Sequence, residues 1–129
     1  MQKNTIIALV IFGLFALAVI LGIVLGKNSE TEVDASLPTL MEIGSVSCEP
    51  CQMLKPIIDG LKDEYQGRVN VVVYDSWNTQ VGAQKASEYD VTSIPTLIYL
   101  DKDGNELYRM VGYQEYSTIK SRFNALGWN

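Results

Sequence analysis

Histidine is absent from this chain, and cysteine occurs only at Cys48 and Cys51. A structural zinc site needs four ligands, usually cysteine or histidine, so two sulfurs without a histidine argue against zinc. The scarcity of soft ligands makes a copper-delivery factor a poor interpretation as well. We therefore expect neither a metal nor another cofactor. A purely structural disulfide is a further alternative, but a loop this short restrains the unfolded chain little.

Basic residues are also scarce, with ten lysines and arginines against fifteen acidic residues in the chain. Lys3 and Lys27 precede residue 28, so residues 28–129 hold eight basic and fifteen acidic side chains, a net charge of −7. An acidic domain without a basic patch argues against nucleic acid as a partner. It also argues against tight adhesion to anionic lipid.

Charged and amide side chains are missing from residues 6–25, whose sequence is IIALVIFGLFALAVILGIVL. Twenty helical residues rise about 30 Å, the thickness of the hydrocarbon core of a bilayer. Secretory signal peptides have shorter apolar cores and a small-residue cleavage site, which this run lacks. The pattern predicts an N-terminal transmembrane helix. We expect an uncleaved signal anchor at residues 1–27, a polar linker at 28–37 and a folded domain at 38–129.

The charges around the apolar run give only a weak signal for its orientation, because the bias in lysine and arginine is small. A short N-terminus and a long C-terminal domain favour a cytoplasmic N-terminus. We therefore expect a single-pass protein of the cell membrane whose domain is extracytoplasmic. Disulfides persist in that location unless they are actively reduced.

Hydrophobic periodicity predicts an α/β domain of order β-α-β-α-β-β-α with a central, mixed, four-stranded sheet. Asp103-Gly104 is a strong hairpin signal between the last two strands. Residues 101–106 lack the length and the late glutamate of a calcium loop, so we interpret them as a turn. The expected strands span residues 37–43, 69–74, 96–100 and 106–111, and the expected helices start near Cys48, at Gln80 and at Tyr116.

The sequence Cys48-Glu49-Pro50-Cys51 opens the first of these helices, and Pro50 in its first turn costs no hydrogen bond. Two cysteines at this spacing can cycle between a dithiol and a disulfide. The helix N-terminus lowers the pKa of the first thiol, and the second thiol lies within reach to resolve a mixed disulfide. An electron-pair carrier is therefore the leading interpretation.

Four features occur in order along residues 39–127: the C-x-x-C at a strand-to-helix junction, Pro56 inside the helix that follows, Ile94-Pro95-Thr96 before the third strand, and Gly112 after the fourth. In this combination the segment resembles a thioredoxin. The family implies a thioredoxin-like fold for the domain. It also implies that Cys48 is the attacking thiolate and Cys51 the resolving thiol.

The resemblance further implies a substrate-binding segment formed by Ile94, Pro95 and Thr96. Pro95 would be cis and lie beside the disulfide, whereas the alternative is an ordinary proline at a strand start. The backbone of Ile94 would then pair with an extended substrate segment and add a strand to the sheet.

Glu42 lies six residues before Cys48, where thioredoxins carry a buried acid beneath the active site. Burial without a partner raises the pKa of a carboxyl group, which can then take the proton from Cys51 during resolution. The alternative is that Glu42 points into solvent. Its apolar neighbours Met41 and Ile43 do not decide between the two.

The chain also departs from the thioredoxin pattern. Ser47 stands directly before the first cysteine, where thioredoxins usually have a tryptophan that shapes partner contacts, so the range of partners is open. The strand and helix that normally precede the first motif strand are missing. Trp77, after the second predicted strand, either packs under a loop, which we favour, or supplies the lost aromatic cover.

Glu49 and Pro50 are the residues expected to tune the redox chemistry. Glu49 replaces the usual glycine, and Glu-Pro occurs in membrane-tethered thioredoxin-like proteins of cytochrome c maturation. An anion about 6 Å from the Cys48 sulfur opposes its thiolate by about 0.7 to 3 kcal/mol. The helix terminus acts the other way with a comparable magnitude. A less stabilised thiolate favours the disulfide form of the enzyme and makes it a better reductant.

These observations predict a membrane-anchored protein-disulfide reductase that draws electrons from a transmembrane donor. Its substrates would be disulfide-containing proteins: an apocytochrome, a misoxidised secreted protein or a peroxidase. One alternative is a disulfide oxidase or isomerase that runs the same residues in reverse. Another is a redox-inert assembly factor, for instance in cytochrome c maturation, that grips extended peptides beside Pro95.

Overall fold

The computed structural model describes residues 2–25 and 33–129, with the side chains of 2–17 and 33–129. The chain divides into two compact units, Met1–Glu32 and Val33–Asn129. Residues 28–32 of the predicted linker lie outside the described part. The rest of that predicted linker belongs to the second unit, where the amide of Asp34 donates to Asn70 Oδ1 at 3.0 Å and Asn70 Nδ2 donates back to the Asp34 carbonyl at 2.8 Å.

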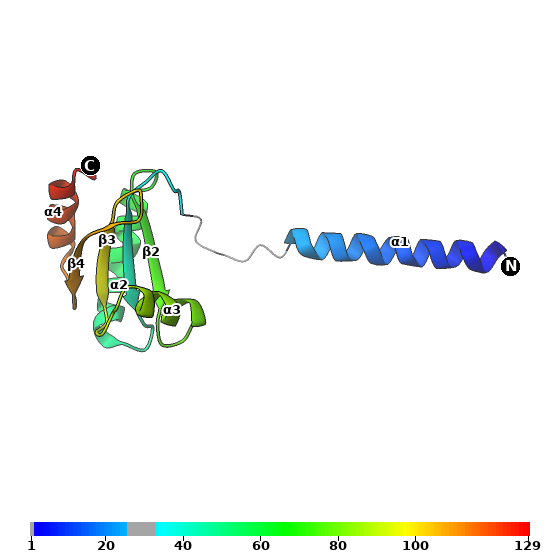
Figure 1. Cartoon of the computed structure of the whole chain (residues 1–129), viewed down its shortest axis with the longest axis horizontal. Helices are drawn as coiled ribbons and strands as arrows, with labels where there is room; N and C mark the ends of the chain where they lie inside the picture. The colour runs from blue at the N-terminus through cyan, green and yellow to red at the C-terminus, as the bar shows by residue number, and fades with distance from the viewer. Residues whose placement is uncertain (1, 26–32) are drawn as a thin grey trace. The chain divides into compact units, whose positions relative to one another are not determined.

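The first unit contains one helix, α1, over Gln2–Leu25 (Figure 1). Within residues 2–25 and 33–129, no helix combines the length and the apolar character that a membrane span requires. This finding overturns the prediction of a transmembrane helix in a single-pass membrane protein with an extracytoplasmic domain.

The second unit is built on one mixed four-stranded sheet (Figure 1), as predicted. β1 (Thr39–Gly44) runs parallel to β2 (Asn70–Asp75) and antiparallel to β3 (Thr96–Leu100). A hairpin joins β3 to β4 (Glu106–Val111), as the Asp103-Gly104 signal indicated, and the strand order is β2-β1-β3-β4. The helices of this unit are α2 (Glu49–Glu64), α3 (Gln80–Glu88) and α4 (Tyr116–Leu126).

The turn between β3 and β4 is organised by one carboxylate. Asp101 Oδ1 accepts the backbone amides of Asp103 and Asn105, each at 2.9 Å. Gly104 follows with a φ of 82°, in the left-handed region that glycine adopts without strain. The interpretation of residues 101–106 as a turn is therefore confirmed.

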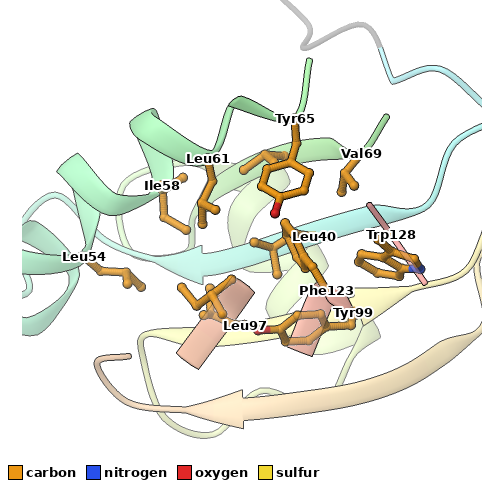
Figure 2. Packing of buried hydrophobic residues seen from close by; sticks show 12 residues of the cluster. Leu40, Leu54, Ile58, Leu61, Tyr65, Val69, Leu97, Tyr99, Phe123 and Trp128 are labelled. Carbon is orange, nitrogen blue, oxygen red and sulfur yellow. The ribbon is translucent and has the colours of Figure 1, made fainter. Parts of the chain in front are cut away.

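Both faces of the sheet are covered, and the alternation of side chains along β1 divides the core in two. Leu40 contributes to the cluster packed by α2 and α4 (Figure 2), whereas Met41 and Ile43 point to the opposite face, toward α3. The larger cluster also includes Leu54, Ile58 and Leu61 of α2, Tyr99 of β3, Ile119 and Phe123 of α4, and Trp128. Because side chains alternate with a period of two, Glu42 shares the face of Leu40 and lies beneath α2.

Candidate active site

The two cysteines form a disulfide at the N-terminus of α2, with their Cα atoms 5.3 Å apart. Cys48 is the N-cap residue, with an extended backbone, and its carbonyl accepts the amide of Gln52 at 3.0 Å. Pro50 lies in the first turn, where no amide donor is needed, and Pro56 lies inside the helix, which continues through it. Cys48 is 7% exposed and Cys51 5% exposed, so both residues are largely shielded from solvent.

The segment before β3 lies against the first sulfur. The Ile94–Pro95 peptide bond is cis, as the resemblance implied, and Cys48 Sγ lies 4.0 Å from the carbonyl oxygen of Ile94. The Gly112 amide donates to the Pro95 carbonyl at 2.8 Å, and the Thr96 hydroxyl donates to the Ser93 carbonyl at 2.6 Å. Pro95 and Thr96 are buried, so only Ile94 of this predicted substrate-binding segment faces an open cavity.

A groove of about 640 Å³ opens beside Cys48. One side comes from the start of α2 and the other from the β2–α3 loop and α3, with the segment before Pro95 between them. Glu49 is the single charged residue among those lining it. The lining residues are Ser47, Cys48, Glu49, Pro50, Ser76, Trp77, Ala83, Ala86, Val91, Thr92, Ser93 and Ile94.

A second pocket, of about 230 Å³, opens beside Cys51 and contains Glu42. Gly44 brings the two groups together, because a Cβ at that position would lie 2.9 Å from Glu42 Oε1 and 3.2 Å from Cys51 Sγ. Lys55 and Lys62 of α2 line the same pocket. The two sulfurs of one disulfide thus face two different cavities, Cys48 the groove and Cys51 the carboxylate pocket.

Glu42 is 4% exposed, so the alternative of a solvent-facing side chain is wrong. Burial raises the pKa of its carboxyl group from 4.5 to about 7. The charges of Lys62 and Lys55 act to lower this pKa, and the charge of Asp59 acts to raise it. Lys55 Nζ and Asp59 Oδ2 form an ion pair at 2.6 Å. Lys62 is the other lysine that lines the pocket, and it forms no ion pair with any residue that the structure describes.

Asp75, at the end of β2, joins the two loops that flank the site. Its Oδ2 accepts the Val46 amide at 3.2 Å, and its Oδ1 accepts the amides of Trp77 and Asn78 at 3.1 and 3.0 Å. Desolvation acts to raise the pKa of Asp75, but these bonds and the side chain of Asn78 lower it to about 2. Sequence reasoning missed this role, although Asp at a strand end before Ser-Trp-Asn is a turn signal.

Trp77 is 63% exposed and lines the groove, so the prediction that it packs under a loop is wrong. Ser47, directly before the first cysteine, lines the same groove and is exposed. Among the residues that the structure describes, no group of three or more potential ligands could hold a metal ion.

A disulfide that caps a helix beside a cis-proline on a mixed sheet defines a thiol–disulfide oxidoreductase. The thioredoxin family model matches residues 23–125. A thioredoxin of Synechocystis sp. is 35% identical over 92 residues, which cover 71% of this chain and 82% of the relative. A thioredoxin of Rickettsia conorii is 33% identical over 102 residues, covering 78% and 93%. The chain belongs to the thioredoxin family.

Proposed function

We propose that this chain reduces disulfides in protein substrates through a dithiol–disulfide cycle of Cys48 and Cys51. The observation that carries the proposal is the division of the site into two cavities. Cys48 faces the groove that is large enough for a substrate segment, whereas Cys51 faces the pocket that holds Glu42. Attack and resolution therefore fall to different sulfurs.

The cycle starts from the reduced enzyme. The Cys48 thiolate attacks one sulfur of the substrate disulfide, forms a mixed disulfide and releases the first substrate thiolate. Cys51 then attacks the Cys48 sulfur and releases the second substrate thiolate. The substrate gains two electrons, and the enzyme is left with the Cys48–Cys51 disulfide.

Glu42 accepts the proton that Cys51 loses in the resolving step. A carboxylate with a pKa of about 7 is half ionised near neutral pH, which suits a group that takes up and returns a proton in each cycle. A Cβ at Gly44 would lie 2.9 Å from Glu42 Oε1 and 3.2 Å from Cys51 Sγ, so one bridging water can connect the carboxylate oxygen to the sulfur.

Glu49 favours the reductase direction. It stands in the first turn of α2, where its charge opposes the thiolate of the neighbouring Cys48. The reduction potential, measured by equilibration with glutathione, tests this direction. A value near −120 mV, in the range of strong oxidants, would contradict it. Glu49→Gln is expected to raise the potential by roughly 10–30 mV. Glu115→Gln, at the N-cap of α4, is the matched control and should leave the potential unchanged.

The chemistry of the proposed cycle defines the class of substrate and the class of electron donor. The substrate is a protein disulfide that can reach Cys48, and the donor is a dithiol of lower potential. The prediction of a transmembrane donor rested on an extracytoplasmic domain and loses its basis with that placement. The apocytochrome target rested on the Glu49-Pro50 dipeptide of membrane-tethered relatives, and no described helix meets the requirements of a membrane span. Trapping with Cys51→Ser identifies the substrates, because the mixed disulfide on Cys48 then stays unresolved.

Two other functions remain distinguishable by experiment. A disulfide oxidase or isomerase would use the same two cysteines, and the potential separates it from a reductase. A redox-inert binding module would keep its activity when both cysteines are replaced by serine. The reduction of insulin by dithiothreitol tests the proposal. If the wild type accelerates this reaction and Cys48→Ser does not, the result supports a reductase. If the wild type does not accelerate it, the proposal is refuted.

A further inference from the structure

We propose that Trp77 and the small side chains of α3 form a subsite for an aromatic side chain next to the reacting cysteine of the substrate. This inference rests on the proposed function and deepens it. The groove beside Cys48 is lined by Trp77 of the β2–α3 loop and by Ala83 and Ala86 of α3. The occupant is an extended segment of a disulfide-containing protein with an aromatic residue beside its cysteine.

The exposure of Trp77 is the first observation. The indole is 63% exposed, and the residue lies in the lining of the groove. Tryptophan offers a large apolar face, a ring that attracts aromatic groups and a single polar N–H. An exposed indole in the wall of a groove that reaches a reactive sulfur is therefore available to a substrate side chain.

The loop that carries Trp77 is held in place on both sides. Asp75 Oδ1 accepts the amide of Trp77, and Asp75 Oδ2 accepts the amide of Val46 in the loop before Cys48. Thr79 caps α3 by accepting the Gly82 amide at 2.9 Å, and its hydroxyl donates to the Asp75 carbonyl at 2.7 Å. An indole on a loop whose backbone is held in place loses less conformational freedom on binding than one on a mobile loop.

The small residues around Trp77 leave room for an occupant. Ala83 and Ala86 of α3 present one methyl group each, and Ser47 and Ser76 are no larger than a hydroxymethyl group. A larger residue at any of these positions would fill part of the groove of about 640 Å³. An aromatic ring is the side chain whose flat shape and large apolar area match an indole wall and this space.

The charge of the groove lining further restricts which substrate segments can bind. Glu49 is the single charged residue among the groove lining, and it stands beside Cys48. A substrate segment with an acidic residue at its cysteine would bring like charges together, whereas a neutral or basic residue would not. The subsite therefore selects an aromatic side chain within a segment that is not acidic.

Two disulfide-bonded peptides test the subsite. Both peptides have the same neutral sequence and one cysteine, which is disulfide-bonded to a small aliphatic thiol. They differ only in the residue beside that cysteine, which is phenylalanine in one peptide and alanine in the other. Both flanking positions are examined. We expect the reduced wild type to react with the better phenylalanine peptide about 3- to 10-fold faster, as a second-order rate constant. Trp77→Ala should abolish this preference, measured as the ratio of the two rate constants, and Trp77→Phe should retain most of it.

Val81→Ala provides the matched control. Val81 is also exposed, at 55%, lies on α3, and is outside the groove lining, so the phenylalanine preference should persist. If the wild type reduces neither peptide, the proposed reductase function fails. If the wild type reduces both but has no phenylalanine preference, or Trp77→Ala keeps that preference, the subsite is refuted and the reductase function stands.

Discussion

Glu42 and Cys51 approach the same point in the structure, the place where a side chain at Gly44 would begin. A Cβ there would lie 2.9 Å from the carboxylate oxygen and 3.2 Å from the sulfur. The absence of that carbon makes a continuous space between the two groups. Under the proposed function, the chemistry of the second cysteine depends on the protonation of this buried acid, and the first two predictions concern Glu42.

The first prediction is that Glu42 makes the protein less stable as the pH rises. The pKa of its carboxyl group is raised in the folded state from 4.5 to about 7. Because this pKa is raised, the contribution of the Glu42 carboxyl group to the free energy of unfolding is fully present below about pH 4.5. It is lost as the pH rises through about 7. Relative to Glu42→Gln, the oxidised wild type should lose roughly 3 kcal/mol of unfolding free energy between pH 4 and pH 9.

Urea unfolding of both oxidised proteins at pH 4, 6.5 and 9 measures this difference. Subtracting the variant from the wild type removes the other titrating groups, which the two proteins share. The variant is expected to be the more stable protein at pH 9. A difference between the two proteins that stays constant over this range would show that the pKa of Glu42 is not raised.

The second prediction concerns Lys62, which lines the pocket around Glu42 and whose charge lowers the pKa of that acid. Lys62→Gln removes this effect, so the pKa of Glu42 should rise. Under the proposed function, the pH midpoint of the resolving step moves up by roughly half a unit, as expected for one charge across a partly solvated pocket. Single-turnover reduction of a disulfide substrate across pH 5–9 measures the midpoint.

Lys102→Gln makes the same change of charge in the β3–β4 turn, away from the pocket lining, and serves as the control for Lys62→Gln. Its midpoint should match that of the wild type. Equal shifts in both variants would mean that net charge, and not the charge at Lys62, sets the pH dependence.

Much of the fold could be predicted because its signals are local. β3 and β4 begin and end at the expected residues, since alternation and the Asp103-Gly104 turn lie within a few positions of each other. The helix predicted from Gln80 has Thr79 as its cap, one residue before it. The cysteine pair and Pro95 also come together as expected, because a strand-to-helix junction and a strand start meet at one end of the sheet.

The missed features depend on contacts between distant residues. Both faces of β1 are buried, so apolar neighbours on each side of Glu42 could not show that it faces α2. The exposure of Trp77 follows from a loop that Asp75 ties to Val46, 29 residues away along the chain. The membrane prediction relied on the apolar composition of residues 6–25, whereas no helix within residues 2–25 and 33–129 combines the length and the apolar character of a membrane span.

The third prediction contrasts two glycines in helices. A Cβ at Gly82 would lie 2.0 Å from the carbonyl oxygen of Asp75, a backbone atom, so α3 or the end of β2 must move. Gly82→Ala should therefore cost about 2–3 kcal/mol of unfolding free energy. Gly60 in α2 is exposed and has nothing within 4 Å of a Cβ, so Gly60→Ala should stabilise the protein by about 0.5–1 kcal/mol. Equal effects of the two substitutions in urea unfolding would contradict the close approach at Gly82.

The last prediction is that Asp75→Ala loosens both loops beside the site without unfolding the domain. The carboxylate accepts the amides of Val46, Trp77 and Asn78, and its removal leaves those donors without their partner. Hydrogen exchange at the three amides should accelerate about tenfold or more, because local opening costs less free energy. Asp101→Ala is the matched control: its carboxylate also accepts two backbone amides, but in the β3–β4 turn. The control should accelerate exchange in that turn and leave Val46 protected, whereas loss of protection at Val46 in both variants would indicate general destabilisation and refute a local tie.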